Sequence, residues 1–305
     1  MFNRFSLLIF SFLILLLAGC GERNEASSYF YSPSFTNDGS IVFIYGLQSI
    51  NKNFLGSELS SSYTETVKTM DTAGAGETFI YDTTGDVPYS MSCSPATGIK
   101  YVAYMGDLRN SSFGKIGIRN IKPSNQTGLT RAEMVFDDAS RIRSFDWSAD
   151  GNKLVFCNDT GVVTRNWNDY TGATDTVIIP QTGVEFVTWK YGNRIAFVYT
   201  DTTGRHLSVI NSDGSGRVDL PAAAMLEKPQ VSPIATNEVY GIAGGSYCKI
   251  DLNDAAPATA EILAKFRGEL PRISPTGDVV VYSKTGAQSG IYSLNLTTKV
   301  ESTLK

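Results

Sequence analysis

The chain has 305 residues, 42% of them hydrophobic, with 26 basic and 30 acidic residues and a net charge of −4 at neutral pH. This length suffices for one large core, and no run of Lys or Arg supplies the basic surface that a nucleic-acid partner needs. One histidine, His206, excludes metal sites built from several imidazoles. We therefore expect no metal, no cofactor and no nucleic acid, and a structural or surface role for His206.

The first 20 residues read MFNRFSLLIFSFLILLLAGC, in which an uncharged apolar run follows Arg4. Such a run is short for a membrane-spanning helix and is typical of a secretory signal. Residues 17–20 resemble the lipobox of bacterial lipoproteins, which implies that residues 1–19 are removed and that acyl chains on Cys20 attach the protein to a membrane. Gly21 in place of Asp favours the outer membrane of the cell envelope. The alternative is an ordinary secretory signal with an incidental cysteine.

Behind this leader, a short polar tether of residues 20–28 is expected to precede a region in which one phrase recurs six times. Each copy has an apolar residue, a turn with small polar residues and Gly, and then a β-rich apolar run. The apolar residues before the turns are Phe35, Cys93, Trp147, Trp189, Val231 and Ile273. The last three steps between them are 42 residues each, and the first two are 58 and 54. Strands repeated at about 40 to 45 residues predict an all-β, six-bladed β-propeller.

Each blade is expected to contain four antiparallel strands, which we call A to D in chain order. Blade 3 shows them most clearly, with strands at 141–147, 153–157, 162–167 and 175–179. Its A–B turn contains Asp150 and Gly151, where Gly supplies the positive φ of a tight turn. The propeller is expected to span 29–305, with blades at about 29–86, 87–137, 138–180, 181–222, 223–264 and 265–305.

Two insertions depart from the period. The larger, residues 47–76, is rich in Ser and Thr, and we place it in the B–C loop of blade 1. The smaller, residues 107–114, falls in the B–C loop of blade 2. All B–C loops of a propeller lie on one face, so the insertions predict that this B–C face is the binding side. The alternative is a tolerated loop without a role.

Parts of the repeats resemble a known family. The turns at 148–151 (SADG) and 274–277 (SPTG) resemble the SPDG turn of TolB-type propeller repeats, and residues 207–220 (LSVINSDGSGRVDL) resemble the outer strands of the same family. The resemblance covers blades 3 to 6 well and blades 1 and 2 loosely. It implies a propeller of the cell envelope. The separate N-terminal α/β domain of TolB is not expected here, so the partners of TolB do not carry over.

Three cysteines remain after Cys20: Cys93, Cys157 and Cys248. Each lies in an apolar strand pattern of a different repeat, without the spacing of a metal site. We expect three buried free thiols. The alternative is a disulfide between Cys93 and Cys157 in neighbouring blades.

Aligning the A strands gives one column of polar residues, four positions before each apolar residue that precedes a turn. The column, which we call the rim, consists of Tyr31, Tyr89, Arg143, Glu185, Glu227 and Glu269. Strand A begins here, at the B–C mouth of the central channel, so the rim predicts a binding site over an apolar throat. The alternative is a solvated loop edge.

These observations favour a lipid-anchored, monomeric propeller that binds a protein or an envelope polymer and is not an enzyme. The alternative is a glycosidase or lyase for envelope polysaccharide, in which Glu185 and Glu227, or Glu227 and Glu269, act as acid and base at a separation of about 5 to 9 Å. A third hypothesis is a purely structural role without a discrete ligand.

Overall fold

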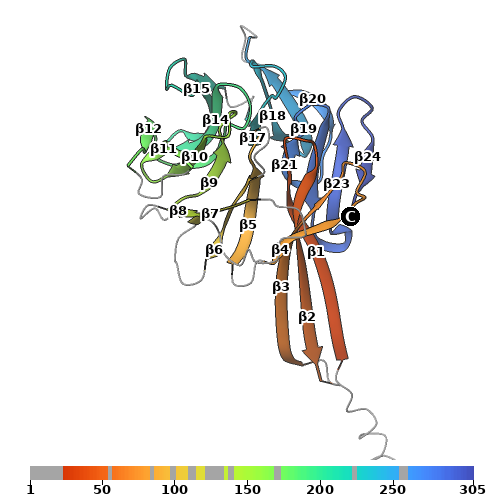
Figure 1. Ribbon diagram of the computed structural model, residues 1–305. Helices are drawn as coiled ribbons and strands as arrows, with labels where there is room; N and C mark the ends of the chain where they lie inside the picture. Colours follow the sequence, from red (N-terminus) through yellow and green to blue (C-terminus); the bar gives the residue numbers. More distant parts are fainter. Residues whose placement is uncertain are drawn as a thin grey trace, which may run out of the picture.

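The computed structural model describes residues 23–53, 57–82, 86–96, 101–108, 115–120, 134–136, 141–167, 173–221, 225–253 and 260–305. In these residues, four consecutive strands form each of six antiparallel sheets (Figure 1). The first strands of neighbouring sheets contact one another, and the first and last sheets also meet, so the sheets close into a ring around a channel. The predicted six-bladed propeller is confirmed. A single 3₁₀ turn, Gly286–Gln288, is the only helical element in the described chain.

The strands follow the expected order A to D in every blade. Blades 1 to 3 consist of β1 (Arg23–Phe35), β2 (Ile41–Lys52), β3 (Glu58–Met70), β4 (Thr78–Asp82); β5 (Asp86–Cys93), β6 (Tyr101–Leu108), β7 (Lys115–Asn120), β8 (Met134–Phe136); and β9 (Ser144–Trp147), β10 (Lys153–Asn158), β11 (Gly161–Asn166), β12 (Thr176–Ile179). Blades 4 to 6 consist of β13 (Val184–Thr188), β14 (Arg194–Asp201), β15 (Gly204–Asn211), β16 (Val218–Leu220); β17 (Glu227–Val231), β18 (Glu238–Ala243), β19 (Ser246–Asp251), β20 (Glu261–Lys265); and β21 (Glu269–Ile273), β22 (Val279–Lys284), β23 (Gly290–Asn295), β24 (Glu301–Thr303).

The A–B turn of blade 3 shows why the repeated phrase folds as it does. The Gly151 amide donates to the Ser148 carbonyl at 2.9 Å, and Gly151 has a φ of 69°, which side chains disfavour. The Ser148 hydroxyl donates to Asp150 at 2.6 Å and accepts from the Lys153 amide at 2.8 Å. The Ser148 hydroxyl and the Asp150 carboxylate thus provide hydrogen-bond partners for the turn from within the turn itself. This short sequence pattern therefore favours the same turn in each repeat that contains it.

The apolar core is divided into six clusters, and each cluster lies between two neighbouring blades. Trp147, which is fully buried, packs with residues of blades 2 and 3. The cluster that closes the ring joins blades 1 and 6 and contains Phe35, Ile41, Phe43, Met70, Val281 and Ile291. Because each sheet contains strands of one blade only, the ring closes by side-chain packing and not by exchange of a strand between the termini.

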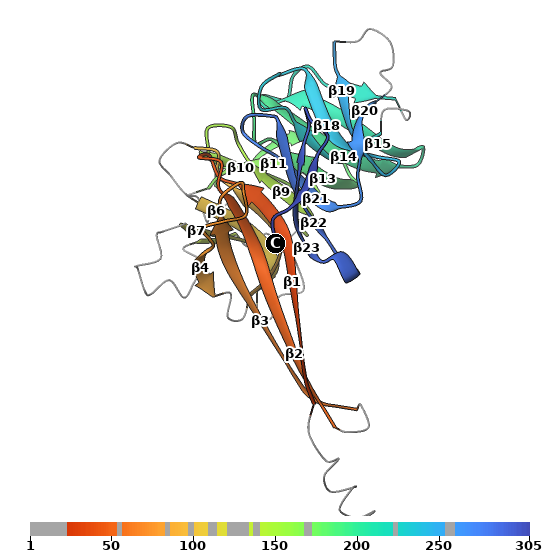
Figure 2. The same ribbon diagram turned by 90° about the vertical axis from the view of Figure 1, so that its right-hand side faces the viewer.

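Strands β1, β2 and β3 continue far beyond the other blades as a three-stranded arm (Figures 1 and 2). Here the structure corrects two expectations. Residues 23–28 of the expected tether belong to β1, and the expected loop at 47–76 is mostly strand, paired from Ile41–Met70 to Asn51–Ser60. Composition misled because Ser and Thr also suit an exposed strand once a partner strand satisfies the backbone. The described chain begins at the far end of this arm (Figure 2).

Cys93, Cys157 and Cys248 are buried free thiols, and the alternative disulfide is absent. The predicted leader and Cys20 lie outside the described residues, as do residues 109–114 of the second insertion. None of the helical structure in the described chain has the length and apolar character to cross a bilayer.

Candidate functional site

The rim residues lie at a recurrent irregularity of strand A. The A–B pairing shifts register between Tyr31 and Ser34 in blade 1, and similar shifts occur at the start of strand A in blades 2, 4, 5 and 6. In three blades the residue directly after the rim position has a φ of 50° without being glycine: Ser32, Lys228 and Leu270. Such bulges redirect side chains at sheet ends. The rim is therefore not a simple ring, and its members point to different neighbours.

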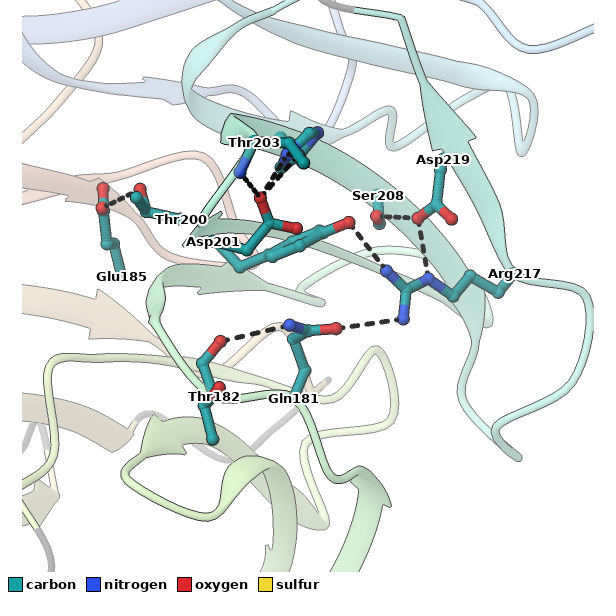
Figure 3. Close-up of polar contacts among 11 residues, drawn as sticks. Gln181, Thr182, Glu185, Thr200, Asp201, Thr203, Ser208, Arg217 and Asp219 are labelled. Atoms are coloured by element: carbon teal, nitrogen blue, oxygen red, sulfur yellow. Dashed lines mark hydrogen bonds and ion pairs between the residues drawn. The ribbon is translucent and has the colours of Figure 1, made fainter.

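Glu185 and Glu227 are joined through a side chain that the sequence analysis did not select. The Nε atom of Arg205 lies 3.1 Å from Glu185 Oε2, and its Nη1 atom lies 3.7 Å from Glu227 Oε1. Thr200 donates to the other oxygen of Glu185 at 2.6 Å (Figure 3). A guanidinium thus lies between the two carboxylates, in the space that a glycosidase leaves for substrate and water.

Arg143 turns away from these carboxylates. Its Nη1 donates to the carbonyl oxygens of Asn158 at 3.1 Å and Val184 at 3.3 Å, and its Nη2 forms an ion pair with Asp159. Arg143 therefore links the B–C loop of blade 3 to blade 4. Tyr89 lies in β5, beside the register shift of blade 2.

Tyr31 belongs to a cluster at the base of the arm. Tyr31 and Tyr63 both donate hydrogen bonds to Oε1 of Glu65, which is 3% exposed. Tyr29 stacks on both tyrosines, with ring centroids 6.0 and 5.5 Å away. Burial raises the pKa of Glu65 to about 7, against a smaller opposing effect of the Tyr31 hydrogen bond. Burial also raises the pKa of Tyr29 to about 12.

Two rim residues, Tyr31 and Glu269, line one groove of about 480 Å³ between the arm and blade 6. One wall is β1 from Ser27 to Tyr31, and the other contains Glu269, Ser283 and Thr285. Thr285 donates to Glu269 at 3.4 Å, and no cationic side chain of the described residues pairs with this carboxylate. The groove opens on the B–C face, because its second wall includes the B–C loop of blade 6.

A second column of strand A, one residue before each apolar residue that precedes an A–B turn, was missed by the sequence analysis. Its members are all buried: Ser34, Ser92, Asp146, Thr188, Gln230 and Arg272. Ser34 and Gln230, for example, bind the backbone of the next blade: the Cys93 amide donates to Ser34 at 3.0 Å, and the Ile273 amide donates to Gln230 at 2.8 Å. Ser92 and Thr188 instead donate to the side chain of Asp146, and Arg272 reaches a blade that is not adjacent. The alignment of the A strands could have revealed this column, because polar residues in the middle of an apolar strand need buried hydrogen-bond partners.

His206 has the surface role that we expected. Its ring stacks on Tyr199 with centroids 4.9 Å apart, and Nε2 lies 3.0 Å from Asp201 Oδ1. A hydrogen bond from Thr203 is the main cause that lowers the pKa of Asp201 to about 2. Beside it, Arg217 donates to Asp219 at 2.7 Å and to Gln181 at 3.4 Å (Figure 3). No group of three or more potential metal ligands occurs in the described chain.

Comparisons with known proteins find similar structures but no protein that is related in sequence. No protein-family model matches, and a search of curated proteins finds no match. The structure resembles the crystal structure of TolB from Acinetobacter baumannii, with a TM-score of 0.50 and 10% identity over 92% of this chain and 68% of that one. The chain has a TolB-type propeller fold. The resemblance inferred from the turns at 148–151 and 274–277 is thereby confirmed at the level of fold.

Two further solved structures are similar. One is a chain of the nidogen/laminin complex, with a TM-score of 0.55 and 9% identity over 91% of this chain and 92% of that one. The other is an oligogalacturonate lyase in complex with manganese, with a TM-score of 0.46 and 10% identity over 85% of this chain and 87% of that one. At these identities the likeness concerns the fold alone, and the lyase is too distant to support an argument about activity.

Proposed function

We propose that the protein is a lipid-anchored, non-catalytic binding module of the bacterial cell envelope, with its binding site on the B–C face. The observation that carries this proposal is the groove between the arm and blade 6. It combines hydroxyl groups, the carboxylate of Glu269, which forms no ion pair with the described residues, and the edge of β1, which are groups that bind an extended protein segment or a polymer chain.

The position of the arm supports the anchor. Cys20 lies three residues before Arg23, at the start of β1 and the far end of the arm. From Arg23 to Tyr31 the strand spans about 26 Å, at about 3.3 Å per residue. Acyl chains on Cys20 would therefore hold the groove about that far from the membrane, with the B–C face directed toward it. The outer membrane is the proposed location.

Supporting evidence for a binding function over catalysis comes from the carboxylates. The pair that a glycosidase or lyase would use, Glu185 and Glu227, is bridged by Arg205. Glu269 lies in the groove next to Thr285 and serves there as a hydrogen-bond acceptor or as the partner of a cation.

The anchor is tested by growth with a radiolabelled fatty acid. The full-length wild type is expected to incorporate the label and to sediment with membranes, whereas Cys20→Ser is expected to do neither. A soluble, unlabelled wild type would contradict the anchor.

The groove is tested by replacing Ser28 with a photoactivatable residue and recovering crosslinked material from whole cells. A defined product is expected, and Glu269→Gln is expected to reduce its yield at least fivefold. Glu261→Gln, at an exposed carboxylate of blade 5, is the control and should leave the yield unchanged. Equal yields from both variants would contradict this site.

A further inference from the structure

Two cationic side chains cross the central channel. Lys190, at the A–B turn of blade 4, is 6% exposed, and its Nζ donates to the Phe35 carbonyl at 2.7 Å and to Ser34 Oγ at 3.4 Å, both in blade 1. Arg272, in blade 6, is 8% exposed, and its Nη2 lies 3.5 Å from the carbonyl oxygen of Met91 in blade 2. Neither pair of blades is adjacent in the ring, so both side chains extend into the channel.

The two cationic groups contact neighbouring strands of the channel wall, Lys190 on β1 and Arg272 on β5. Ser34 Oγ, which contacts Lys190, also accepts the Cys93 amide at 3.0 Å. Met91, which contacts Arg272, lies two residues before Cys93 on the same strand, about 7 Å away at about 3.3 Å per residue. The ammonium and the guanidinium therefore approach the same part of the channel wall from two sides.

The buried carboxylate of Asp146, which accepts a hydrogen bond from the Lys190 amide, does not form an ion pair with the side chain of Lys190 or Arg272. Asp146 is 3% exposed, and its two oxygens accept hydrogen bonds at 2.7 to 3.2 Å from five donors: Ser92 Oγ, Thr188 Oγ1 and the backbone amides of Trp147, Trp189 and Lys190. None of these donors is a cationic group. Among the ion pairs of the described residues, none includes the side chain of Lys190 or Arg272.

The channel thus holds two cations and one carboxylate that is already fully hydrogen-bonded. Burial is the main cause that lowers the pKa of Lys190, and the charge of Arg272 adds to it, while Cys93 and Asp146 oppose it. The guanidinium of Arg272 stays charged and offers five N–H donors in a planar fork, and among the described residues one of its nitrogens, Nη2, has a hydrogen-bond acceptor, at 3.5 Å. A buried charge of this kind is stable only with a counter-ion.

We propose that the channel binds a small oxyanion, a carboxylate or a phosphate, between the guanidinium of Arg272 and the ammonium of Lys190. The fork of Arg272 matches two oxygens of such an anion, and Lys190 supplies a further donor. We place entry at the B–C mouth, because side chains reach across the A–B end: Lys190 donates to the Phe35 carbonyl of blade 1, and Tyr191 donates to the Ile273 carbonyl of blade 6 at 3.4 Å. Lys228, which is exposed and follows Glu227 of the rim, adds positive charge at this mouth.

The first test is thermal unfolding of the full-length protein at pH 7.5 during titration with inorganic phosphate, at an ionic strength held constant with chloride. A saturable rise of Tm is expected, because a ligand that binds only the folded state stabilises it by mass action. A parallel titration with acetate distinguishes a carboxylate site from a phosphate site. If neither phosphate nor acetate raised the Tm above its value in chloride at the same ionic strength, the proposal would be overturned.

The second test compares Arg272→Met with Arg267→Met, an exposed arginine of the same blade. Arg272→Met is expected to weaken the apparent affinity for phosphate or acetate at least tenfold, and to be no less stable than the wild type in chloride alone because the uncompensated charge is gone. Arg267→Met is expected to respond as the wild type. Lys190→Met should weaken the response as well, with exposed Lys153→Met as its control.

If Arg272→Met does not fold, Arg272→Lys provides the comparison, since it keeps the charge and removes the planar fork. A several-fold weaker response is expected. An unchanged anion response in either variant at Arg272 would assign that residue a structural role only and would overturn the site.

Discussion

At the scale of single residues, Glu65 is the clearest case of a side chain whose chemistry is set by packing. Its carboxyl group is buried and accepts hydrogen bonds from the hydroxyls of Tyr31 and Tyr63, whose rings both stack on Tyr29. Gly46 makes this possible, because a Cβ atom there would lie 2.2 Å from the Tyr29 ring. The Tyr29 ring thus packs directly on the backbone of Gly46. Burial of the Glu65 carboxyl group in this cluster raises its pKa.

This pKa predicts a pH dependence of stability. The folded pKa of about 7 lies above the ordinary value of 4.5, so the folded state holds the proton more tightly than the unfolded state between these pH values. The contribution of Glu65 to the free energy of unfolding is fully present below pH 4.5 and is lost as the pH rises through 7. From pH 5 to 8, wild type is expected to lose roughly 2 to 3 kcal/mol relative to Glu65→Gln, at about 1.4 kcal/mol per pKa unit.

The measurement is urea denaturation of both proteins across this pH range. Glu58→Gln, at an exposed position of the same strand, should follow the wild type. A parallel pH course of wild type and Glu65→Gln would show that Glu65 is ionised in the folded state.

A second residue-scale prediction concerns Asp146. Five donors converge on its oxygens, so Asp146→Asn places an NH₂ group against at least two of them. The expected loss is about 2 to 4 kcal/mol in the free energy of unfolding, the cost of buried unsatisfied groups and a broken buried network. Asp159→Asn, at an exposed carboxylate, should cost less than about 1 kcal/mol. Similar values for the two variants would contradict the buried network.

At the scale of elements, the arm is a continuation of blade 1 with little core of its own. All residues of β3 from Glu58 to Thr64 are exposed, and Leu59 and Tyr63 remain 55% and 45% exposed. The pairing with β2 nevertheless persists to Glu58, with one register shift between Ser60 and Glu58. Main-chain hydrogen bonds and the tyrosine cluster at its base therefore hold the arm, whereas side-chain burial holds the blade.

Shortening the arm tests this separation. Deleting residues 48–63 and joining Leu47 to Thr64 through Asn-Gly is expected to lower the free energy of unfolding by only about 1 to 2 kcal/mol, because few buried side chains are lost. The check is the Tm by circular dichroism, together with an unchanged β-sheet spectrum. Loss of the folded propeller would show that the arm is part of its core.

At the scale of the whole molecule, the ring is closed by the cluster between blades 1 and 6. Phe43 is fully buried there against Val281 and Ile291. The ion pair between Lys305 and Glu77, at 3.0 Å, joins the same two blades at the surface. The apolar clusters join neighbouring blades only. Without the closing cluster, the first and the last blade would each bury apolar side chains on one side only.

Phe43→Ala is therefore expected to reduce the free energy of unfolding by about 3 to 5 kcal/mol, the usual cost of a cavity left by Phe in a core. Phe79→Ala, in the outer strand of the same blade and 49% exposed, is expected to cost less than about 1 kcal/mol. Urea denaturation measures both values. Comparable costs would place the closure of the ring elsewhere.

Periodic and local features were accessible from the sequence. The repeat and the Gly-bearing turns predicted six blades, and the expected strands of blade 3 agree with β9 to β12 within a few residues. The rim was predicted as one ring, but its members take different partners: Arg205 joins Glu185 and Glu227, while Arg143 pairs with Asp159. Register shifts at the start of strand A accompany Glu185 and Glu227, whereas Arg143 precedes β9 of a blade without such a shift. Neither difference leaves a periodic mark in the sequence.

By itself, the sequence determined the number of repeats, the order of strands and the type of turn, because these depend on residues close together in the chain. Only the tertiary structure decided that residues 47–52 and 58–65 extend an arm, that Glu65 is buried, and that Lys190 and Arg272 both extend into the channel. Those outcomes depend on which distant backbone groups and charges become neighbours when the ring closes. Lys190 shows the difference: in sequence it is one lysine before a turn, and in the closed ring it reaches the opposite blade.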